Sequence, residues 1–412
     1  MDFYHFTEFP WPHLPPDDQF TSMRVNLPSR VYDPKIGADL YNMYLDQHVL
    51  ADELGLNCMV NEHHQTATCM NSAAPLSLAI LARITKNARL CILGNPPANR
   101  RDPIRIAEEM AMVDNISHGR LECGFVRGVP YELFASNANP TETGERLWES
   151  IDLIIKAWTT HDGPFNYEGK WVHKRQVNVW PRPYQQPHPQ IWLTGGSDIN
   201  HATKAIVRGH TFCMFLTPAD KMRAMFDGVR ENCDKAGLPQ PADEQFGFMP
   251  LVFVGETEEE ARKGIEQVFW YVTHNKSEPQ FRAPPGYVET EMYANFLSGK
   301  FSGGRTDAIR RLGIEYFREH HVAIYGTPDS VVKQIKSAFR KTGGFGQFLA
   351  MMHSGAMDFK TTAKCMKLFA EEVVPQVKHL GGKRPQFGPL SEWKKKPKAK
   401  PGAGRNGKRK AA

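Results

Sequence analysis

Apolar positions along the chain alternate between two spacings, one typical of buried strands and one typical of amphipathic helices. Residues 102–128, DPIRIAEEMAMVDNISHGRLECGFVRG, contain both. Asp102 can cap a helix that holds Pro103 in its first turn, and Gly119 can end that helix. Residues 121–126 then have the composition of a buried strand. The expected apolar face of the helix comprises Ile106, Ala107, Met110, Ala111 and Val113.

The same alternation extends over most of the chain. We expect buried strands at residues 3–9, 57–61, 89–93, 121–126, 190–193, 211–216, 246–254 and 347–352. We expect helices at residues 37–55, 71–87, 142–160, 218–236, 256–273 and 358–378, and two more that end near residues 208 and 341. Seven or eight strand–helix units without a repeat predict an α/β fold, a (β/α)8 TIM barrel. A doubly wound sheet is the alternative.

Two stretches interrupt the pattern and predict rim insertions. Residues 161–189 are rich in Pro, Gly and aromatic side chains, which favours an excursion on the barrel rim with a small hairpin. Residues 275–322 have no clean period, which favours a lid-like insertion. We therefore predict one barrel domain over residues 1–382, followed by a disordered basic tail over residues 383–412.

The tail accounts for the basic character of the chain. Residues 386–412 contain nine Lys or Arg and one Glu, so residues 1–385 carry a net charge of −2 although the whole chain carries +6. A nearly neutral body does not favour nucleic-acid binding. The tail itself is either a solvated segment or a weak binder of acidic partners.

Composition favours a cytoplasmic protein without metal or membrane span. The seven cysteines are scattered and form no CxxC pair, which is typical of reduced, packed thiols. The start, MDFYHFTEFPWPHLPPDD, lacks the basic segment of a signal peptide. No apolar run approaches the ~18 residues of a membrane helix. Neither an HExxH motif nor an acidic cluster predicts a metal site.

Anion-binding candidates stand at the ends of two predicted strands, where parallel α/β proteins place their sites. Arg127 follows one strand, and its planar fork suits a phosphate or carboxylate, although a surface ion pair is an equal alternative. Gly195, Gly196 and Ser197 lie between a strand and a helix, whose first N–H groups can bind an anion. The turn matches neither the dinucleotide fingerprint nor the P-loop.

Two further strand ends carry polar side chains. Glu62, His63 and His64 follow a short apolar strand, and neighbouring strand residues face opposite ways, so one histidine should face the barrel mouth. A histidine there suits proton transfer near neutral pH, while a hydrogen-bonded structural histidine is the alternative. Asn95 could hydrogen-bond a flat heterocycle or simply occupy a turn.

Taken together, these segments resemble the bacterial luciferase-like flavin monooxygenases. The resemblance runs from about residue 3 to residue 379. It rests on Glu62-His63-His64, Gly94-Asn95, the run PIRIAEEMAMVDNISHGRLECGFVRG, the turn WPRPYQQPHPQIWLTGGS, and the late segments GTPDSVVKQI and LFAEEVVP.

The resemblance implies a (β/α)8 barrel that binds diffusible reduced flavin mononucleotide (FMN) and uses O2 as co-substrate. It implies that His63 lies by the flavin and acts in proton transfer. From their places at the strand ends we also expect Glu62 to take part in catalysis and Asn95 to bind the cofactor. The resemblance also implies that Arg127 and the Gly195-Gly196-Ser197 turn meet the phosphate. Relatives are commonly dimers or tetramers, so we expect a homo-oligomer.

The sequence departs from the family in two places. Val126 stands where the light-emitting subunit has a reactive cysteine, so we do not expect light emission. Residues 96–101 replace an aliphatic-rich loop near the substrate. We expect monooxygenation of a small apolar organic compound, with reduced FMN from a separate flavin reductase, because no nicotinamide-binding motif is present. A deazaflavin-dependent oxidoreductase and a non-catalytic flavin-binding protein are the alternatives.

Overall fold

The structure is a computed structural model that describes residues 1–195, 198–274, 278–282, 284–288, 290, 294 and 305–381. Within these residues parallel strands close into a barrel, because β1 pairs with β2 on one side and with β12 on the other. This closure confirms the (β/α)8 barrel rather than an open doubly wound sheet. The strands are β1 (Asp2–Thr7), β2 (Asn57–Val60), β3 (Leu90–Asn95), β4 (Leu121–Phe125), β7 (Gln190–Thr194), β8 (Thr211–Phe215), β9 (Phe246–Met249), β10 (Leu251–Val254), β11 (Ala323–Gly326) and β12 (Gln347–His353).

One barrel strand is broken at Pro250. Its halves, β9 and β10, both pair with β12, and β10 also pairs with β11. The predicted strand at 246–254 is therefore present with an interruption. The sequence analysis missed β11, because its four residues give too short a pattern to separate from the neighbouring helix.

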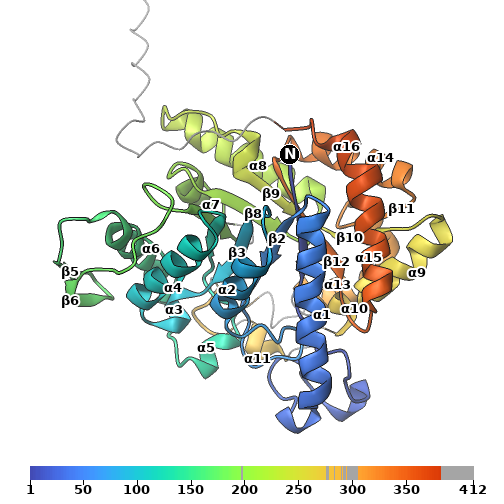
Figure 1. Cartoon of the computed structure of the whole chain (residues 1–412), viewed down its shortest axis with the longest axis horizontal. Coiled ribbons are helices and arrows are strands. Elements are labelled where there is room, and N and C mark those ends of the chain that lie inside the picture. The colour runs from blue at the N-terminus through green and yellow to red at the C-terminus, as the bar shows by residue number, and fades with distance from the viewer. Residues whose placement is uncertain are drawn as a thin grey trace, which may run out of the picture.

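Helices surround the strands (Figure 1). The longer helices are α1 (Pro34–Glu53), α2 (Ala74–Ile84), α4 (Pro103–Ile116), α6 (Thr143–Thr159), α7 (Ile199–Ile206), α8 (Ala219–Lys235), α9 (Glu258–Val268), α13 (Arg305–Glu319), α14 (Pro328–Thr342) and α15 (Phe359–Leu368). The shorter ones are α3 (Pro97–Arg100), α5 (Glu132–Ala135), α10 (Trp270–His274), α11 (Pro279–Arg282) and α16 (Val374–Val377). Between α15 and α16 a π-helical segment, Phe369–Val373, interrupts the single helix expected there.

Most predicted helices are present with shifted ends. Asp102 caps α4 as expected, accepting hydrogen bonds from Ile104 N at 3.1 Å and Arg105 N at 3.4 Å. The rim excursion contains the expected hairpin, formed by β5 (Phe165–Glu168) and β6 (His173–Val177). The predicted insertion at 275–322 lies partly outside the described residues, and the predicted tail from residue 383 lies wholly outside them.

The amino end of the barrel is filled. The Tyr4 hydroxyl donates to Glu122 at 2.7 Å, and Arg89 donates to the same carboxylate at 2.9 Å. Burial raises the pKa of Glu122 to about 7, although Arg89 favours its charged form. Tyr4 also packs edge-on against Trp192, with ring centroids 5.5 Å apart. Space for a ligand is therefore confined to the carboxyl end.

Three further observations bear on the composition-based predictions. None of the helices in the described part of the chain is long and apolar enough to cross a membrane. All seven cysteines are buried and form no disulfide. Across the described ranges, no three His, Cys, Asp or Glu side chains are grouped so that they could hold a metal ion.

Candidate functional site

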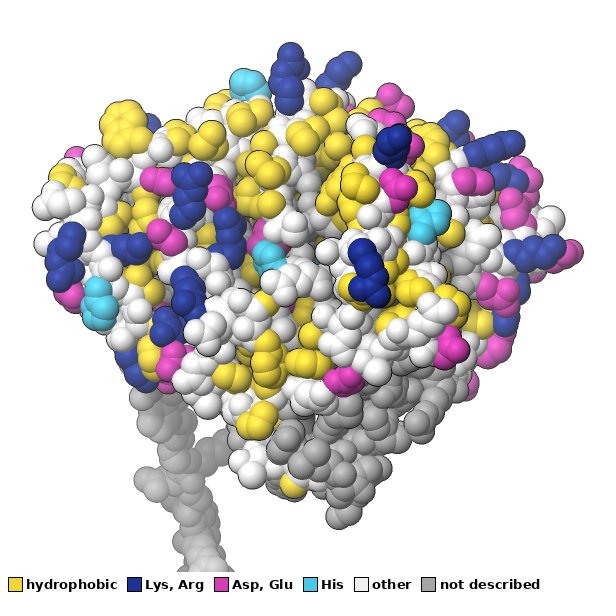
Figure 2. Space-filling view, turned by 90° about the horizontal axis from the view of Figure 1, so that it is seen from below, with side chains coloured by type: hydrophobic (Ala, Val, Ile, Leu, Met, Phe, Trp, Pro, Cys, Tyr) yellow, Lys and Arg dark blue, Asp and Glu magenta, His cyan; other side chains and the backbone are white. Residues whose placement is uncertain are grey.

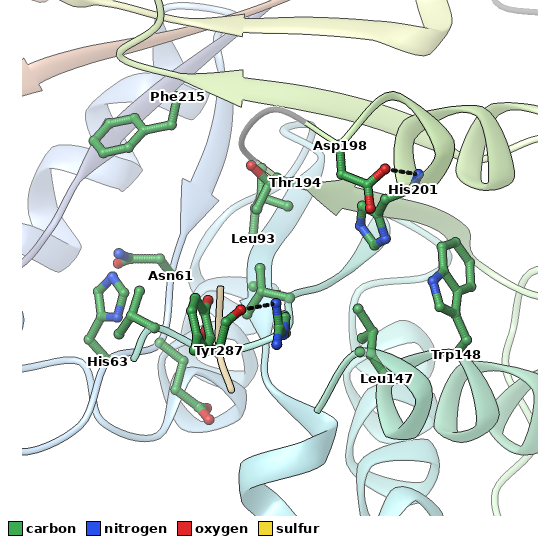
Figure 3. A pocket seen from close by; sticks show the side chains of 18 of the residues that line it. Asn61, His63, Leu93, Leu147, Trp148, Thr194, Asp198, His201, Phe215 and Tyr287 are labelled. Atoms are coloured by element: carbon green, nitrogen blue, oxygen red, sulfur yellow. Dashed lines mark hydrogen bonds between the residues drawn. The ribbon is translucent and has the colours of Figure 1, made fainter. Parts of the chain in front are cut away.

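A cavity of about 1240 Å³ opens at the carboxyl ends of the strands. Figure 2 views the molecule from the end of Figure 1 where α5 and α11 lie, and acidic, basic and apolar side chains are interspersed over that face. The cavity exceeds the ~300–1,000 Å³ typical of small-molecule sites, so it can hold a flavin together with a second molecule. Figure 3 shows His63 and Asn61 on one side of it and Asp198, His201 and Trp148 on the other.

The inner wall of the cavity is apolar. It is built by side chains from the ends of several strands: Phe6, Met59, Leu93, Phe215 and Met249. Gly94 allows β3 and β4 to approach closely, because a Cβ there would come within 2.3 Å of Val126 Cγ1. Such a wall excludes water from the flat face of a bound ring.

His63 lies between two buried carboxylates. Its Nδ1 is 3.0 Å from Glu132 Oε1, and its Nε2 is 3.8 Å from Glu8 Oε2. Glu8 also accepts a hydrogen bond from Asn61 Nδ2 at 2.7 Å. All four residues except Glu132 line the cavity, so the His63 ring reaches it, as predicted for one of the two histidines.

His64 takes a different carboxylate partner. Its Nε2 is 3.2 Å from Glu62 Oε1, while Glu62 Oε2 accepts from Ala74 N, the first residue of α2. The hydrogen bond to Glu62 raises the pKa of His64 above its usual value, although partial burial opposes this. His64 does not line the cavity, whereas buried Glu62 does. The structure therefore couples Glu62 to His64 and to the start of α2 rather than to His63.

An arginine that the sequence analysis missed lies at the His63 side. Arg24 comes from the long loop after β1, is buried and lines the cavity. It donates to the Tyr131 hydroxyl at 2.8 Å and to the Tyr271 hydroxyl at 3.1 Å. Tyr131 in turn donates to Glu132 at 3.2 Å. These bonds join segments that follow β1, β4 and β10 into one buried network around His63.

Arg127 is held in place by three acceptors. Its Nε donates to Thr143 Oγ1 at 2.7 Å, and its two terminal nitrogens each donate at 3.0 Å to the carbonyl oxygens of Pro140 and Tyr287. The guanidinium also lies 4.1 Å from the centre of the Tyr287 ring. Arg127 lines the cavity as expected, so the structure gives it a fixed orientation there rather than an ion pair at the surface.

The start of α7 forms another part of the cavity wall. Gly195 lines it, while Gly196 and Ser197 lie outside the described residues. Asp198 caps α7 and accepts from the N–H groups of Asn200 and His201 at 2.9 and 3.1 Å. The helix start that the sequence analysis offered to an anion is therefore occupied by a carboxylate of the chain itself.

Basic side chains from α7 also reach this wall. His201 and Lys204 both line the cavity, next to Trp148 from α6. Burial lowers the pKa of His201, and Asp198 opposes that effect. Burial, followed by the charge of Arg208, lowers the pKa of Lys204. The sequence analysis missed both residues. The one sequence feature that could have indicated them is their position in the first turns of a helix that directly follows a strand.

The structure does not bring Asn95 into the cavity wall. Asn95 is fully buried, and its Oδ1 accepts from Arg100 at 3.2 Å. Its carbonyl oxygen accepts from Val126 N at 3.0 Å, which ties β3 to the segment that leads to Arg127. Asn95 therefore supports the cavity wall from behind.

A closed α/β barrel with a deep cavity at the carboxyl ends of its strands, lined by a carboxylate-bound histidine and a fixed arginine, defines a small-molecule site of enzyme type. The family model for luciferase-like monooxygenases matches residues 26–345. The chain belongs to that family.

Curated relatives include flavin-dependent monooxygenases. The oxygenase component of the flavin-dependent trigonelline monooxygenase of Acinetobacter baylyi is 32% identical over 176 residues, which span 42% of this chain and 48% of that protein. The chain thus matches about half the length of that relative. The 2,5-diketocamphane 1,2-monooxygenase 2 of Pseudomonas putida is 21% identical over 86% of this chain and 97% of its own length. The FMNH2-dependent dimethylsulfone monooxygenase of Pseudomonas putida is 23% identical over 68% and 72%.

Solved structures share the fold. The monooxygenase RslO1 from Streptomyces bottropensis superposes with a TM-score of 0.67 at 25% identity, covering 91% of this chain and 99% of that one. The oxygenating constituent of 3,6-diketocamphane monooxygenase from Pseudomonas putida, in complex with FMN, has a TM-score of 0.67 at 20% identity over 91% and 97%. An F420-dependent secondary alcohol dehydrogenase has a TM-score of 0.62 at 16% identity over 84% and 96%.

Proposed function

We propose that this protein is a monooxygenase that uses reduced FMN and O2 to oxidise a small organic compound. The observation that carries the proposal is one cavity lined by both His63, bound to a buried carboxylate, and Arg127, fixed by three hydrogen bonds. Family membership supports it, as do relatives named as flavin-dependent and FMNH2-dependent monooxygenases. Reduced flavin, when bound, supplies the reaction with O2.

The proposed phosphate end of the cavity is formed by Arg127, Gly195, Gly196 and Ser197, with Lys204 as an addition from the structure. Arg127 and Lys204 bring positive charge to a wall that also carries Asp198. The planar guanidinium suits a phosphate oxygen pair. Asn95 would contribute to flavin binding through the wall it supports rather than through its side chain.

The apolar part of the cavity would contact the substrate and the flavin ring. Phe215 and Met249 face the same space as Leu93. Excluding water there protects a reactive intermediate and strengthens electrostatic interactions inside the site. We propose that His63 moves a proton at its Nε2, the ring nitrogen not bound to Glu132, and that Glu62 acts by holding His64 and the start of α2.

We propose two protein partners: a separate flavin reductase that supplies reduced FMN, and a second copy of this chain. Helices α2 and α4 pack side by side and expose a row of large apolar side chains: Leu76, Ile80, Ile84, Met112 and Ile116. An exposed apolar surface of this kind marks a protein interface. The same surface on two copies can pair around a two-fold axis. We propose a homo-oligomer built on this surface, formed by a cytoplasmic protein whose residues 1–382 act as one domain.

Light scattering after size exclusion tests the oligomer. The full chain should elute with at least twice its monomer mass of 46.7 kDa. The double variant Ile80→Lys, Met112→Lys should elute as a monomer, because two buried charges per copy would oppose association. A monomeric parent protein contradicts the proposal.

Deazaflavin is the second candidate cofactor, favoured by the fold shared with an F420-dependent dehydrogenase. Anaerobic titration of the full chain with reduced FMN, reduced riboflavin and reduced F420 separates the candidates. Charge-assisted hydrogen bonds contribute about 1.5–3 kcal/mol each, so FMN should bind at least about tenfold more tightly than riboflavin. Arg127→Ala should abolish most of that difference.

Mixing the complex with O2 then tests the activity. Rapid reoxidation of bound FMN, with product formed from a ketone, sulfone or pyridinium substrate, supports a monooxygenase. Equal affinity for FMN and riboflavin contradicts the phosphate placement. Binding of FMN without any reaction with O2 would contradict the monooxygenase proposal and would support a non-catalytic flavin-binding protein.

A further inference from the structure

One carboxylate of the network around His63 has no counterpart in the residues that the sequence pointed to. Glu132 begins the short helix α5, which follows β4 and the Arg127 segment. The residue is only 3% exposed. It lies behind the His63 ring and does not line the cavity itself. Because Glu132 does not line the cavity, it does not contact the substrate. Glu132 can therefore affect the reaction only through His63.

The Glu132 carboxylate is held by several donors at once. Oε1 accepts from His64 N at 2.9 Å and from the Tyr131 hydroxyl at 3.2 Å, and Oε2 accepts from Val129 N at 3.4 Å. Tyr131 is itself fixed by Arg24 at 2.8 Å. The position of the carboxylate is therefore set before any ligand arrives.

The charge of Glu132 is also set. Burial alone would raise the pKa of this carboxyl, but its hydrogen bonds to His63 and to His64 N outweigh burial and lower that pKa. Glu132 is thus a carboxylate at neutral pH, and a carboxylate can only accept a hydrogen bond. The His63 nitrogen 3.0 Å away must then carry the proton.

We propose that Glu132 is the positioning residue of His63: it holds the proton on Nδ1, so that the Nε2 lone pair is the one available in the cavity. The inference rests on the proposed role of His63 in proton transfer. In that step Nε2 takes a proton from a donor in the cavity and later returns it. The Nδ1 proton stays on His63, bound to Glu132, and no proton passes to the carboxylate.

Charge balance supports the same assignment. The imidazolium formed in that step lies between Glu132 at 3.0 Å and Glu8 at 3.8 Å. Two fixed negative charges stabilise a positive ring in a buried site. The orienting partner of a catalytic histidine can contribute up to about 10⁴ in kcat, largely through the correct tautomer.

Nitrogen-15 NMR of histidine-labelled full chain without cofactor tests the proposal directly. In the parent protein, neutral His63 should give the signals of a single Nδ1–H tautomer. In Glu132→Ala the Nδ1 acceptor is lost, so the Nε2–H form should grow and the tautomers should become a mixture. In Glu132→Gln the amide oxygen can take the place of Oε1, which accepts from both Nδ1 and His64 N, so the Nδ1–H tautomer should remain. An unchanged Nδ1–H form in Glu132→Ala overturns the proposal.

Two variants guard against loss of folding. Glu132→Leu fills more of the same buried space and also offers Nδ1 no acceptor, so it carries the test if Glu132→Ala does not fold. Asp52→Asn is the matched control: this buried carboxylate accepts from three backbone N–H groups, of Lys86, Asn87 and Ala88, at the other end of the barrel. It should lower stability without changing the His63 tautomer. A tautomer mixture in Asp52→Asn would contradict a specific role for Glu132.

A second readout separates this inference from the proposed function. With reduced FMN and O2 as probes, the pH profile of hydrogen peroxide release should change shape in Glu132→Ala and in His63→Ala. A tautomer mixture without any change in the peroxide profile of either variant supports the positioning of the ring by Glu132. The same result removes His63 from the proposed chemistry.

Discussion

At the scale of single residues, the two adjacent histidines have separate surroundings. His63 lines the cavity and bonds Glu132, whereas His64 bonds Glu62 and does not line the cavity. Their different partners agree with the alternation expected of neighbouring residues at the end of a strand. The same side chain type can thus serve chemistry at one position and structure at the next.

The pair predicts contrasting effects of two alanine substitutions. His63→Ala should leave FMN affinity within a few-fold, because the phosphate end is elsewhere, and should lower product formed per FMNH2 by roughly 10²–10⁴, the usual span for a positioned acid or base. Hydrogen peroxide release should rise. The measurement is product and peroxide per FMNH2 at saturating flavin.

His64→Ala is the matched control for this prediction. It removes the ion-pair partner of buried Glu62 and should mainly lower the melting temperature. Unchanged coupling in His63→Ala, or a larger coupling loss in His64→Ala, would show that the wrong histidine has been assigned.

At the scale of elements, the caps of α4 and α7 have different consequences. Both helices begin after an aspartate whose side chain accepts from two backbone N–H groups. Asp102 lies away from the cavity and pairs with Lys174 at 2.9 Å. Asp198 lies in the cavity wall with Arg127 and Lys204. A local stabilising device therefore places a negative charge beside the proposed phosphate.

Asp198→Asn should tighten FMN binding. Asparagine caps a helix as well as aspartate, so α7 should keep its start while the cavity wall loses one negative charge. Removing a charge repulsion of about 1 kcal/mol in a partly solvated site corresponds to a few-fold gain in affinity for FMN. Riboflavin has no phosphate, so its affinity should not change. Titration with both flavins measures it.

Asp102→Asn makes the same chemical change at the start of α4 and should leave both affinities as they are. An equal gain for riboflavin in Asp198→Asn would indicate a change of cavity shape. A weaker affinity for FMN would indicate that Asp198 binds the cofactor through another group.

At the scale of the whole molecule, buried neutral histidines make the fold sensitive to acid. Burial lowers the pKa of His210 to about 3 and that of His353 to about 3. Burial lowers the pKa of His5 and His48 as well. The Nδ1 atom of His353 bonds Gln47 and Thr362, at 2.9 and 3.0 Å, so the ring is held by neutral partners.

The sign of the pH effect follows from these directions. An unfolded histidine binds a proton below about pH 6.5, whereas the folded one does not until about pH 3. Stability is therefore present above pH 6.5 and falls with pH through this window, by about 1.4 kcal/mol per pH unit for each fully buried histidine. Between pH 6.5 and pH 5, His210 and His353 should each destabilise the fold by about 2 kcal/mol.

Urea unfolding at a series of pH values measures this slope. His353→Gln should make the slope shallower between pH 6.5 and pH 5, even if its stability at pH 7.5 is lower. His118→Gln, at an exposed position, should leave the slope unchanged. A free energy of unfolding that does not depend on pH in this window would contradict neutral burial of these rings.

The sequence by itself determined the order of most strands and helices, the α4 cap and the placement of His63 and Arg127 at strand ends. These features depend on local hydrogen bonds and on the spacing of apolar side chains, which neighbouring residues fix. The (β/α)8 class followed because strand–helix alternation leaves few ways to bury both faces of a parallel sheet.

Only the tertiary structure decided which side chains meet. Glu132 reaches His63 from 69 residues along the chain, and Tyr271 reaches Arg24 from 247 residues away. It also turned Asn95 into a wall support and gave β10 an extra partner in β11. The physical reason is that such contacts depend on the paths of loops. Loop residues have no regular alternation of buried and exposed positions, so the sequence pattern does not predict those paths.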